Sequence, residues 1–479
     1  MTAPSALGVR ASGQIRIALR RYLARAGDWL LRHQRAIRRL QWIVVGIYLV
    51  LVAVPAFLPL PVYTAHIWGN VTLAAQFAFW GIWWPFVLLS MVLVGRSWCG
   101  LFCPEGALTE FASKHSRGLA VPRWLTWPGW PFVAFALTTI YGQMISVYQY
   151  PKPVLVILGG STLGAVAVGF LYGRNKRIWC RYLCPVNGVF GLLSKLAPVH
   201  FRVDQDLWHA SQERHDKHLP AVNCAPLVPI RTMVGGSQCH MCGRCSGFRG
   251  VIALSPRAPN QEIVEYSGAK PDRWETALIL FGLMGIAIGA FHWSASPWFI
   301  AVKQWLATWL VNHDIVWPLD ATLPWFVLTD YPEQNDVMNL LDGALLLAYI
   351  AGTALIMGLA LSGLLAMATR LLGSWSWPRF HHLAQALIPQ AGVGVFLGLS
   401  ALTVTMLKGE GIALPWIGLL RGAMLAGATL WSAWLGWRVA GLYAPGLRAP
   451  KLARGVAAGC VLAAACLSDL AWALLFWVW

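Results

Sequence analysis

Long apolar segments recur from one end of the chain to the other, and they restrict the fold more than any other feature. A transmembrane helix needs about 20 mostly apolar residues. Such segments lie at 41–60, 72–95, 128–148, 153–172, 274–293, 338–369, 383–406, 413–440 and 455–478. Only 12% of the 479 residues are charged, whereas soluble domains have about 25%. These features predict an all-α polytopic membrane protein with about nine transmembrane helices. They exclude a soluble enzyme, a disordered chain and a secreted disulfide-rich protein.

The distribution of basic residues predicts how these helices are oriented. Lys and Arg accumulate in the short cytoplasmic loops of membrane proteins. If the N-terminus is cytoplasmic, 33 of the 37 Lys and Arg residues fall in cytoplasmic segments, and the outside loop at 294–337 carries mostly acidic charges. This topology also accounts for the net charge of +18. The lipid bilayer is therefore the expected partner, and nucleic acid is not.

The N-terminal segment 1–40 is predicted to form a basic amphipathic helix. Apolar residues recur at helical spacing between Ile15 and Leu30, with arginines between them. We expect this helix to lie on the anionic cytoplasmic leaflet. The long basic region before the first span is not typical of a cleavable signal peptide.

Two similar cysteine motifs follow the second and fourth predicted spans, within duplicated hairpins at 41–199. The first is GRSWCGLFCPEG, with Cys99 and Cys103, and the second is GRNKRIWCRYLCPVNG, with Cys180 and Cys184. Both motifs follow spans that run from outside to inside, so both are expected at the cytoplasmic surface of the membrane. Two hairpins in the same orientation imply a pseudo-two-fold axis along the membrane normal, which would bring the two cysteine pairs face to face.

The residues around these cysteines suit an anionic metal cluster. Proline is accommodated in the first turn of a helix, so Pro104 and Pro185 place Cys103 and Cys184 before helix N-termini. The partial positive charge of a helix N-terminus favours thiolate, and the basic residues of the motifs add to it. We therefore expect thiolate ligands at this surface.

A third cysteine group lies in the cytoplasmic segment 200–273. Cys239, Cys242 and Cys245 have the C-x-x-C-x-x-C spacing that begins a bacterial ferredoxin motif. The fourth cysteine of that motif would stand at the position of Arg249. Cys224 is the nearest candidate for the missing ligand, and we expect it to approach the other three.

Eight cytoplasmic cysteines make two sites of four thiolates each. The simplest partition gives one site the four motif cysteines and the other site the four loop cysteines. The sites are then Cys99, Cys103, Cys180 and Cys184, and Cys224, Cys239, Cys242 and Cys245. A crossed partition is the alternative, because ferredoxins take the fourth ligand from a remote segment.

Other uses of the cysteines compete with iron–sulfur clusters. Four thiolates also suit structural zinc, which is an alternative for the loop cysteines. Disulfides are not expected, because all eight cysteines lie on the reducing side of the membrane. Covalent haem would need His where the chain has Gly243. Cys460 and Cys466 in the last span are expected to pack as small apolar residues.

These motifs resemble those of the membrane-bound 4Fe-4S polyferredoxins of the NapH/NosR/CcoG type. The resemblance covers about residues 40–260 and rests on WCGLFCPEG, WCRYLCPVNG and CHMCGRCSGFRG. It implies [4Fe-4S] clusters, location in the bacterial inner membrane, and electron transfer between the quinol pool and redox partner proteins. The chain departs from the family because two full ferredoxin motifs and a flavin-binding domain before the first span are absent. The five C-terminal helices also have no counterpart.

The C-terminal domain at 274–479 carries fewer functional signals. His382 and Gln385 at the cytoplasmic start of the seventh span are a candidate quinone headgroup site. An interfacial histidine near lipid headgroups is the simpler interpretation. No haem is expected, because histidines do not face each other from helices within the membrane. Arg421 and Asp469 lie at matching depth in the last two spans, which predicts an ion pair.

The sequence thus predicts an electron carrier rather than a substrate-converting enzyme, and no catalytic residues are assigned. Electrons would pass through two [4Fe-4S] clusters at the cytoplasmic face, in connection with the quinone pool. The alternative function is a metal-reducing or assembly factor for a respiratory enzyme, which would use the same clusters. Activity with a quinol analogue, or with copper or iron ions, would separate the two functions.

Overall fold

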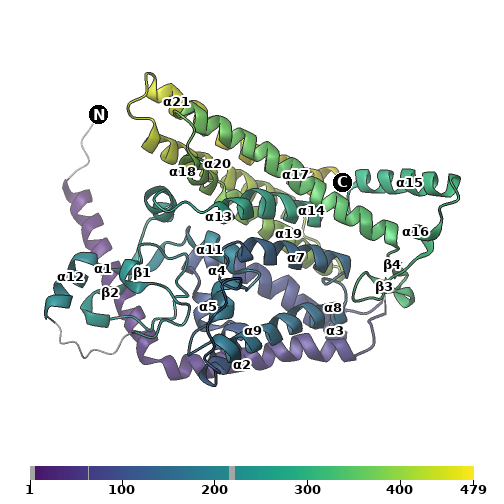
Figure 1. The fold of residues 1–479 in the computed structure, drawn as a ribbon, viewed down its shortest axis with the longest axis horizontal. Helices are drawn as coiled ribbons and strands as arrows, with labels where there is room; N and C mark the ends of the chain where they lie inside the picture. Colours follow the sequence, from purple (N-terminus) through teal and green to yellow (C-terminus); the bar gives the residue numbers. More distant parts are fainter. Residues whose placement is uncertain (1–5, 63, 215–221) are drawn as a thin grey trace.

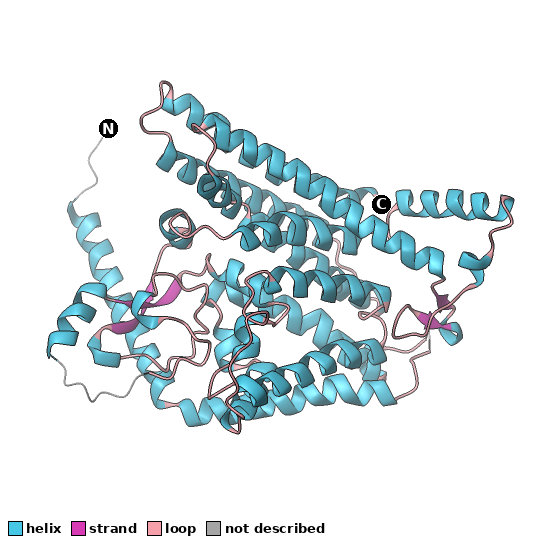
Figure 2. Cartoon of the chain, in the orientation of Figure 1, coloured by secondary structure: helices cyan, strands magenta, loops and turns pink. Residues whose placement is uncertain are grey.

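The computed structural model describes residues 6–62, 64–214 and 222–479 as a bundle of helices (Figure 1). Among these residues, paired strands are confined to two small two-stranded sheets (Figure 2). A bundle of apolar helices satisfies its backbone hydrogen bonds internally, which is the condition for crossing a bilayer. The predicted all-α class is therefore confirmed.

Seven helical segments are long and apolar enough to span a membrane. They cover Gln34–Phe57, Val71–Val94, Pro151–Tyr172, Arg273–His292, Leu340–Leu371, Ile388–Gly409 and Pro450–Val478. Helices also occupy the two remaining predicted positions, but α7 (Trp130–Met144) has only 15 residues and α20 (Ile417–Tyr443) contains Arg421 and Arg438. The described part of the chain thus contains seven clear membrane-spanning candidates.

The two cysteine motifs follow the same order of elements, with a span, a short helix that carries the first cysteine, and a further helix beyond the second. In the first copy the elements are α3 (Val71–Gln76), α4 (Trp84–Val94), α5 (Ser97–Leu101) and α6 (Pro104–Lys114). In the second copy they are α8 (Pro151–Val154), α9 (Gly160–Tyr172), α10 (Ile178–Tyr182) and α11 (Asn187–Ser194). Helix α6 packs closely along α9, because a Cβ atom on Gly169 would lie 2.6 Å from the backbone oxygen of Thr109.

The ferredoxin-like segment is a small irregular unit held by one sheet. Strand β1 (Val199–Val203) pairs antiparallel with β2 (Ile252–Pro256). Their buried side chains form a core with Leu23 and Leu30 of the N-terminal helix α1 (Ala6–Arg32). The apolar side of α1 therefore packs on the ferredoxin-like segment, and this differs from the expected position on the lipid leaflet.

The two ends of the bundle differ in what they carry. Figure 1 shows α1, the β1–β2 sheet, α12 (Gln205–Arg214) and the short helix α5 at one end. The opposite end carries α15 (Pro297–Asn312), α16 (Trp317–Asp320) and the second sheet. In Figure 1, α5 lies inward of α1 and α12, beside α4 and α11.

The C-terminal helices pack against the duplicated hairpins through a continuous apolar core. The first helical segment of this domain is Arg273–His292, which includes α13 (Arg273–Ala277) and α14 (Ala287–His292). The remaining helices are α2 (Gln34–Ala53) of the first span, and α17 (Leu340–Leu371), α18 (Trp377–Gln385), α19 (Ile388–Gly409) and α21 (Pro450–Ala473). The second sheet pairs β3 (Asp330–Tyr331) with β4 (Asp336–Val337).

The predicted ion pair between Arg421 and Asp469 is wrong. The carboxylate of Asp469 accepts hydrogen bonds from Gln390 of α19 and Thr429 of α20. The Arg421 guanidinium lies over the ring of Phe476, 4.2 Å from its centroid. The predicted matching depth was also wrong, because Asp469 lies level with Thr429 and Arg421 lies level with Phe476. Thr429 stands eight residues after Arg421 on α20, which is about two helical turns.

Candidate metal centres

The four motif cysteines line a single cavity of about 150 Å³. Cys99 lies on α5, and Cys103 directly precedes α6. Cys180 lies on α10, and Cys184 follows the end of that helix. The two short helices thus present their cysteines to a common space, which is the arrangement that the repeated motifs predict.

Burial dominates the chemistry of these thiols. It raises the pKa of Cys103 and Cys184 well above the ordinary value, and that of Cys180 to about 12. The Gly106 N–H donates to Cys103 Sγ at 3.3 Å, as expected at a helix N-terminus, but this single bond does not offset desolvation. A bound cation such as iron would favour the thiolate form of these side chains.

Two buried arginines supply positive charge beside this cavity. Arg96 is 4% exposed and Arg177 is 1% exposed. Arg96 donates to the Asn187 side chain at 2.7 Å, while its Nε atom has no partner in the described structure. Both guanidinium groups act to lower the pKa of Cys180. A net negative cluster is stabilised by such charges.

The loop cysteines form a second group. Cys239, Cys242 and Cys245 lie near one another, since each of the other two thiols contributes to the raised pKa of Cys239. Cys224 interacts electrostatically with the same three thiols, although it lies well upstream in the sequence. The Met241 N–H donates to Cys239 Sγ at 3.4 Å. The structure thus brings Cys224 to the compact motif.

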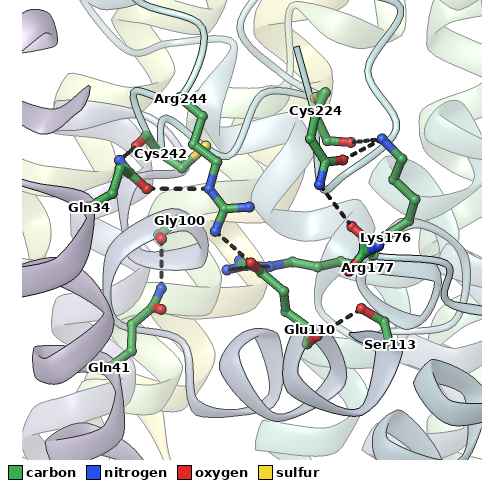
Figure 3. A network of polar contacts seen from close by, with 12 residues as sticks. Gln34, Gln41, Gly100, Glu110, Ser113, Lys176, Arg177, Cys224, Cys242 and Arg244 are labelled. Atoms are coloured by element: carbon green, nitrogen blue, oxygen red, sulfur yellow. Dashed lines mark hydrogen bonds and ion pairs between the residues drawn. The ribbon is translucent and has the colours of Figure 1, made fainter. Parts of the chain in front are cut away.

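Helix α2 contacts both cysteine groups through two glutamines (Figure 3). Gln34 Nε2 donates to the backbone oxygen of Cys242 at 2.9 Å. Gln41 Nε2 donates to the backbone oxygen of Gly100, also at 2.9 Å. The first span therefore contacts both the loop segment and the first membrane motif, and these two contacts fix their positions along α2.

A buried carboxylate connects the two groups a second time. Glu110 on α6 binds Arg177 at 2.7 Å and Arg244 at 2.7 Å (Figure 3). Arg177 Nη1 also donates to the backbone oxygen of Cys99 at 2.6 Å. Burial alone would raise the pKa of Glu110, but the two arginines outweigh it and the pKa lies below the ordinary value.

The backbones of the two segments touch at Gly100. A Cβ atom on this glycine would lie 2.0 Å from the His240 oxygen and 2.9 Å from the Cys242 nitrogen. Only glycine permits this approach. The segments that carry the two cysteine groups are therefore direct neighbours.

Lys176 fixes Cys224 in place. Its Nζ atom donates to the Asn223 side chain at 2.6 Å and to the backbone oxygen of Cys224 at 3.3 Å (Figure 3). The sequence identified Lys176 only as a nearby charge. It gave no indication of the roles of Gln34, Glu110 and Arg244, because these residues act across long sequence separations.

The spacing of the cysteines bears on the zinc alternative. In the described part of the chain, groups of three or more His, Cys, Asp or Glu side chains that would hold one metal ion are absent. Tetrahedral zinc draws four sulfurs to about 2.3 Å from one centre. The motif cysteines surround an open space of about 150 Å³.

The candidate quinone position at His382 is occupied by the protein itself. His382 Nδ1 bonds the Tyr443 hydroxyl at 2.8 Å, and Nε2 bonds the Ile263 oxygen at 2.7 Å. Gln385 bonds Lys195 and Glu275. These side chains connect helices, and they leave no ring nitrogen of His382 for a headgroup.

The comparison with known proteins bears directly on the motif cysteines. A family described as a 4Fe-4S binding domain matches residues 76–122 and 156–204, and each match contains one C-x3-C-P motif. In these two stretches the chain is similar to 4Fe-4S proteins of the NosR and NapH type. This confirms the resemblance and the 4Fe-4S chemistry.

Three relatives are similar to parts of this chain. YccM of Escherichia coli (strain K12), named for electron transport, is 26% identical over 43% of this chain and 62% of its own length. The regulatory protein NosR of Pseudomonas aeruginosa is 25% identical over 34% of this chain and 25% of its own length. The methylamine utilization ferredoxin-type protein MauN of Methylorubrum extorquens is 26% identical over 24% of this chain and 43% of its own length.

The chain therefore spans less than two thirds of each of these relatives. No solved structure matches it. The 4Fe-4S domain and the relatives support iron–sulfur electron transfer by a membrane protein.

Proposed function

We propose that the protein is a membrane electron carrier that passes electrons through two [4Fe-4S] clusters at the cytoplasmic face and exchanges them with the quinone pool. The observation that carries this proposal is the meeting of two four-cysteine groups at Gly100. One group lines a cavity beside the membrane helices, and the other lies in the ferredoxin-like segment. Together they form a route from the bilayer to the cytoplasm.

The donor sets fit the proposed clusters. Each group consists of four thiols, which is the ligand set of a [4Fe-4S] cluster. Glu105 and His240 also line the cavity of the motif cysteines. When bound, the clusters supply one-electron chemistry at these positions. The protein holds the two groups side by side through Glu110, Arg177 and Arg244, and the arginines balance negative charge.

Two adjoining apolar cavities support the link to quinone. The cavity of the motif cysteines and a second cavity of about 140 Å³ share Trp84, Leu158 and Phe190 in their walls. Ligand sites are mostly apolar and rich in aromatic side chains. The shared chamber runs from the cysteines between membrane helices, where an isoprenoid quinone dissolved in lipid would enter.

Chemical analysis tests the cluster assignment. Anaerobically purified protein should contain iron and acid-labile sulfide in the amounts of two [4Fe-4S] clusters, and little zinc. Cys99→Ser should remove one EPR signal and Cys239→Ser the other. Cys460→Ser, a buried cysteine on α21, serves as the control and should remove neither. Stoichiometric zinc without sulfide would refute the proposal.

Filling the chamber tests the quinone link separately. Leu158→Trp should slow reduction of the clusters by a soluble quinol analogue while both EPR signals persist. Leu163→Trp on the same helix is the matched control, because Leu163 is 72% exposed. Equal rates in the two variants would contradict a quinone in this chamber.

A further inference from the structure

The outer face of helix α1 is basic and aromatic. One helical stripe on this face carries five exposed residues. They are Arg21, Tyr22, Arg25, Trp29 and Arg32. Tyr22 is 71% exposed and Trp29 is 52% exposed. None of the three arginines forms a salt bridge with another described residue.

The inner face of the same helix touches the second cysteine group. The side chain of Leu30 contacts the loop at Gly243, where a Cβ atom would lie 2.5 Å from the Cβ of Leu30. Gln34, just beyond the end of α1, binds the backbone of Cys242. A helix with its side chains is about 10 Å across. A molecule on the outer face is therefore about one helix diameter from the proposed cluster.

The composition of the stripe is that of a protein-binding surface. Tyr, Trp and Arg are the residues that most often dominate binding energy at interfaces. Lone positive charges on an exposed face attract an oppositely charged partner and accelerate its association. The stripe therefore favours a partner with a negative surface.

A lipid leaflet would also be negative, but the structure disfavours it as the occupant. An amphipathic helix binds a membrane by burying its apolar face among the lipids. The apolar residues Leu23, Ala26 and Leu30 are already packed on the ferredoxin-like segment. Of the other aliphatic side chains described on α1, the exposed Ile17 and Leu31 point to a different side of the helix from Leu19, so they do not form one wide apolar face with it.

We propose that the outer face of α1 is the docking surface for an acidic, soluble electron-carrier protein that exchanges electrons with the site of Cys224, Cys239, Cys242 and Cys245. This proposal rests on the proposed electron-transfer function. One electron passes between this protein and the carrier, one being oxidised as the other is reduced. No covalent bond forms or breaks.

Binding of a soluble acidic ferredoxin to the full chain in zwitterionic nanodiscs tests the surface. The variant Arg21→Glu/Arg25→Glu should weaken binding about tenfold or more at low salt, and raised salt should remove most of the difference. The control Arg448→Glu/Lys451→Glu makes the same change in net charge at exposed positions remote in the sequence and should bind like the wild type. Trp29→Ala should weaken binding at every salt concentration.

Electron transfer gives the second measurement. Stopped-flow reduction of the ferredoxin should slow in the Arg21→Glu/Arg25→Glu variant by a factor similar to the loss of affinity. Unchanged EPR signals and an unchanged melting temperature would show that the variant is folded and carries its clusters. Wild-type affinity in this variant overturns the docking proposal while leaving the electron-transfer function standing. If the protein contains no clusters but still binds the ferredoxin, the electron-transfer function is refuted and the docking surface on α1 is supported.

A hydrogen-exchange experiment separates the partner from lipid. The ferredoxin should protect the amides of residues 17–32 in zwitterionic nanodiscs. If anionic lipid protects the same amides and the ferredoxin does not, α1 is a lipid-binding helix and the proposal fails.

Discussion

Single residues at the junction of the two cysteine groups carry much of what is specific to this protein. Cysteine spacing identified the ligand candidates, because the ligands of a thiolate site stand a few residues apart in the sequence. Gly100 and Glu110 were not identifiable in this way. Their roles depend on His240, Cys242 and Arg244, which lie more than 100 residues away in the sequence. Local sequence patterns therefore cannot predict these roles.

Gly100→Ala should separate the two cysteine groups. Its methyl group would meet the His240 oxygen at 2.0 Å, and the backbones must move apart. Overpacking of this kind costs about 1–3 kcal/mol. We expect a lower melting temperature and a weaker magnetic interaction between the two reduced clusters in EPR spectra. Gly427→Ala is the control, because the space around Gly427 is open. Unaltered cluster coupling in Gly100→Ala would show that the contact does not set the distance.

Glu110→Gln should destabilise the junction by about 3–5 kcal/mol, because it leaves two arginines beside a neutral group. The effect should depend on pH. The folded-state pKa of Glu110 lies below the ordinary value of about 4.3. Its ion pairs therefore contribute fully above that value and are lost as the pH falls through the folded pKa.

Thermal denaturation of the wild type and of Glu110→Gln at several pH values measures this dependence. The difference in melting temperature should be greatest near neutral pH and should shrink in acid. Glu265→Gln, at an exposed position, should show no such trend. A difference that grows in acid would contradict the assignment.

Among the elements, the contact between α6 and α9 decides whether the two membrane motifs form one site. Gly169→Val should push α6 away from Thr109, because even a Cβ atom would lie 2.6 Å from its backbone oxygen. The EPR signal of the motif cysteines should be altered or lost, while the signal of the loop cysteines persists. Gly160→Val on the same helix has open space and serves as the control. Loss of both signals would mean that the two sites do not assemble independently.

Helices were easier to predict than the contacts between them. Apolar length and proline positions are local, so seven of the nine predicted spans correspond to long apolar helices, and α6 starts at Pro104 as predicted. Helix α11 begins at Asn187, later than Pro185 suggests, because a turn intervenes. Arg421 and Asp469 show the limit most clearly. Hydropathy does not give the register of one helix against the next, and in the structure Asp469 lies level with Thr429 and Gln390 rather than with Arg421.

For the whole molecule, the packed bundle and the ferredoxin-like segment should respond differently to loss of iron. The bundle has a continuous apolar core, whereas the segment has one short sheet and a small core. Removing iron with a chelator should therefore expose the amides of residues 222–256 and of α1 to hydrogen exchange. The membrane helices should keep their protection, and adding iron and sulfide should restore the segment. Uniform loosening of the chain would show that the bundle also depends on the metal.

The position of Gln34 and Gln41 in the first span has a consequence for biogenesis. Chains are made from the N-terminus, and their parts fold in that order. Helix α2 is therefore in the membrane before any of the eight cysteines has been synthesised. The hydrogen-bond partner of Gln41, Gly100, is synthesised 59 residues later, and the partner of Gln34, Cys242, is synthesised 208 residues later. The first span therefore presents both glutamine side chains before either cysteine-bearing segment is complete, and each segment can dock on it in the order of synthesis.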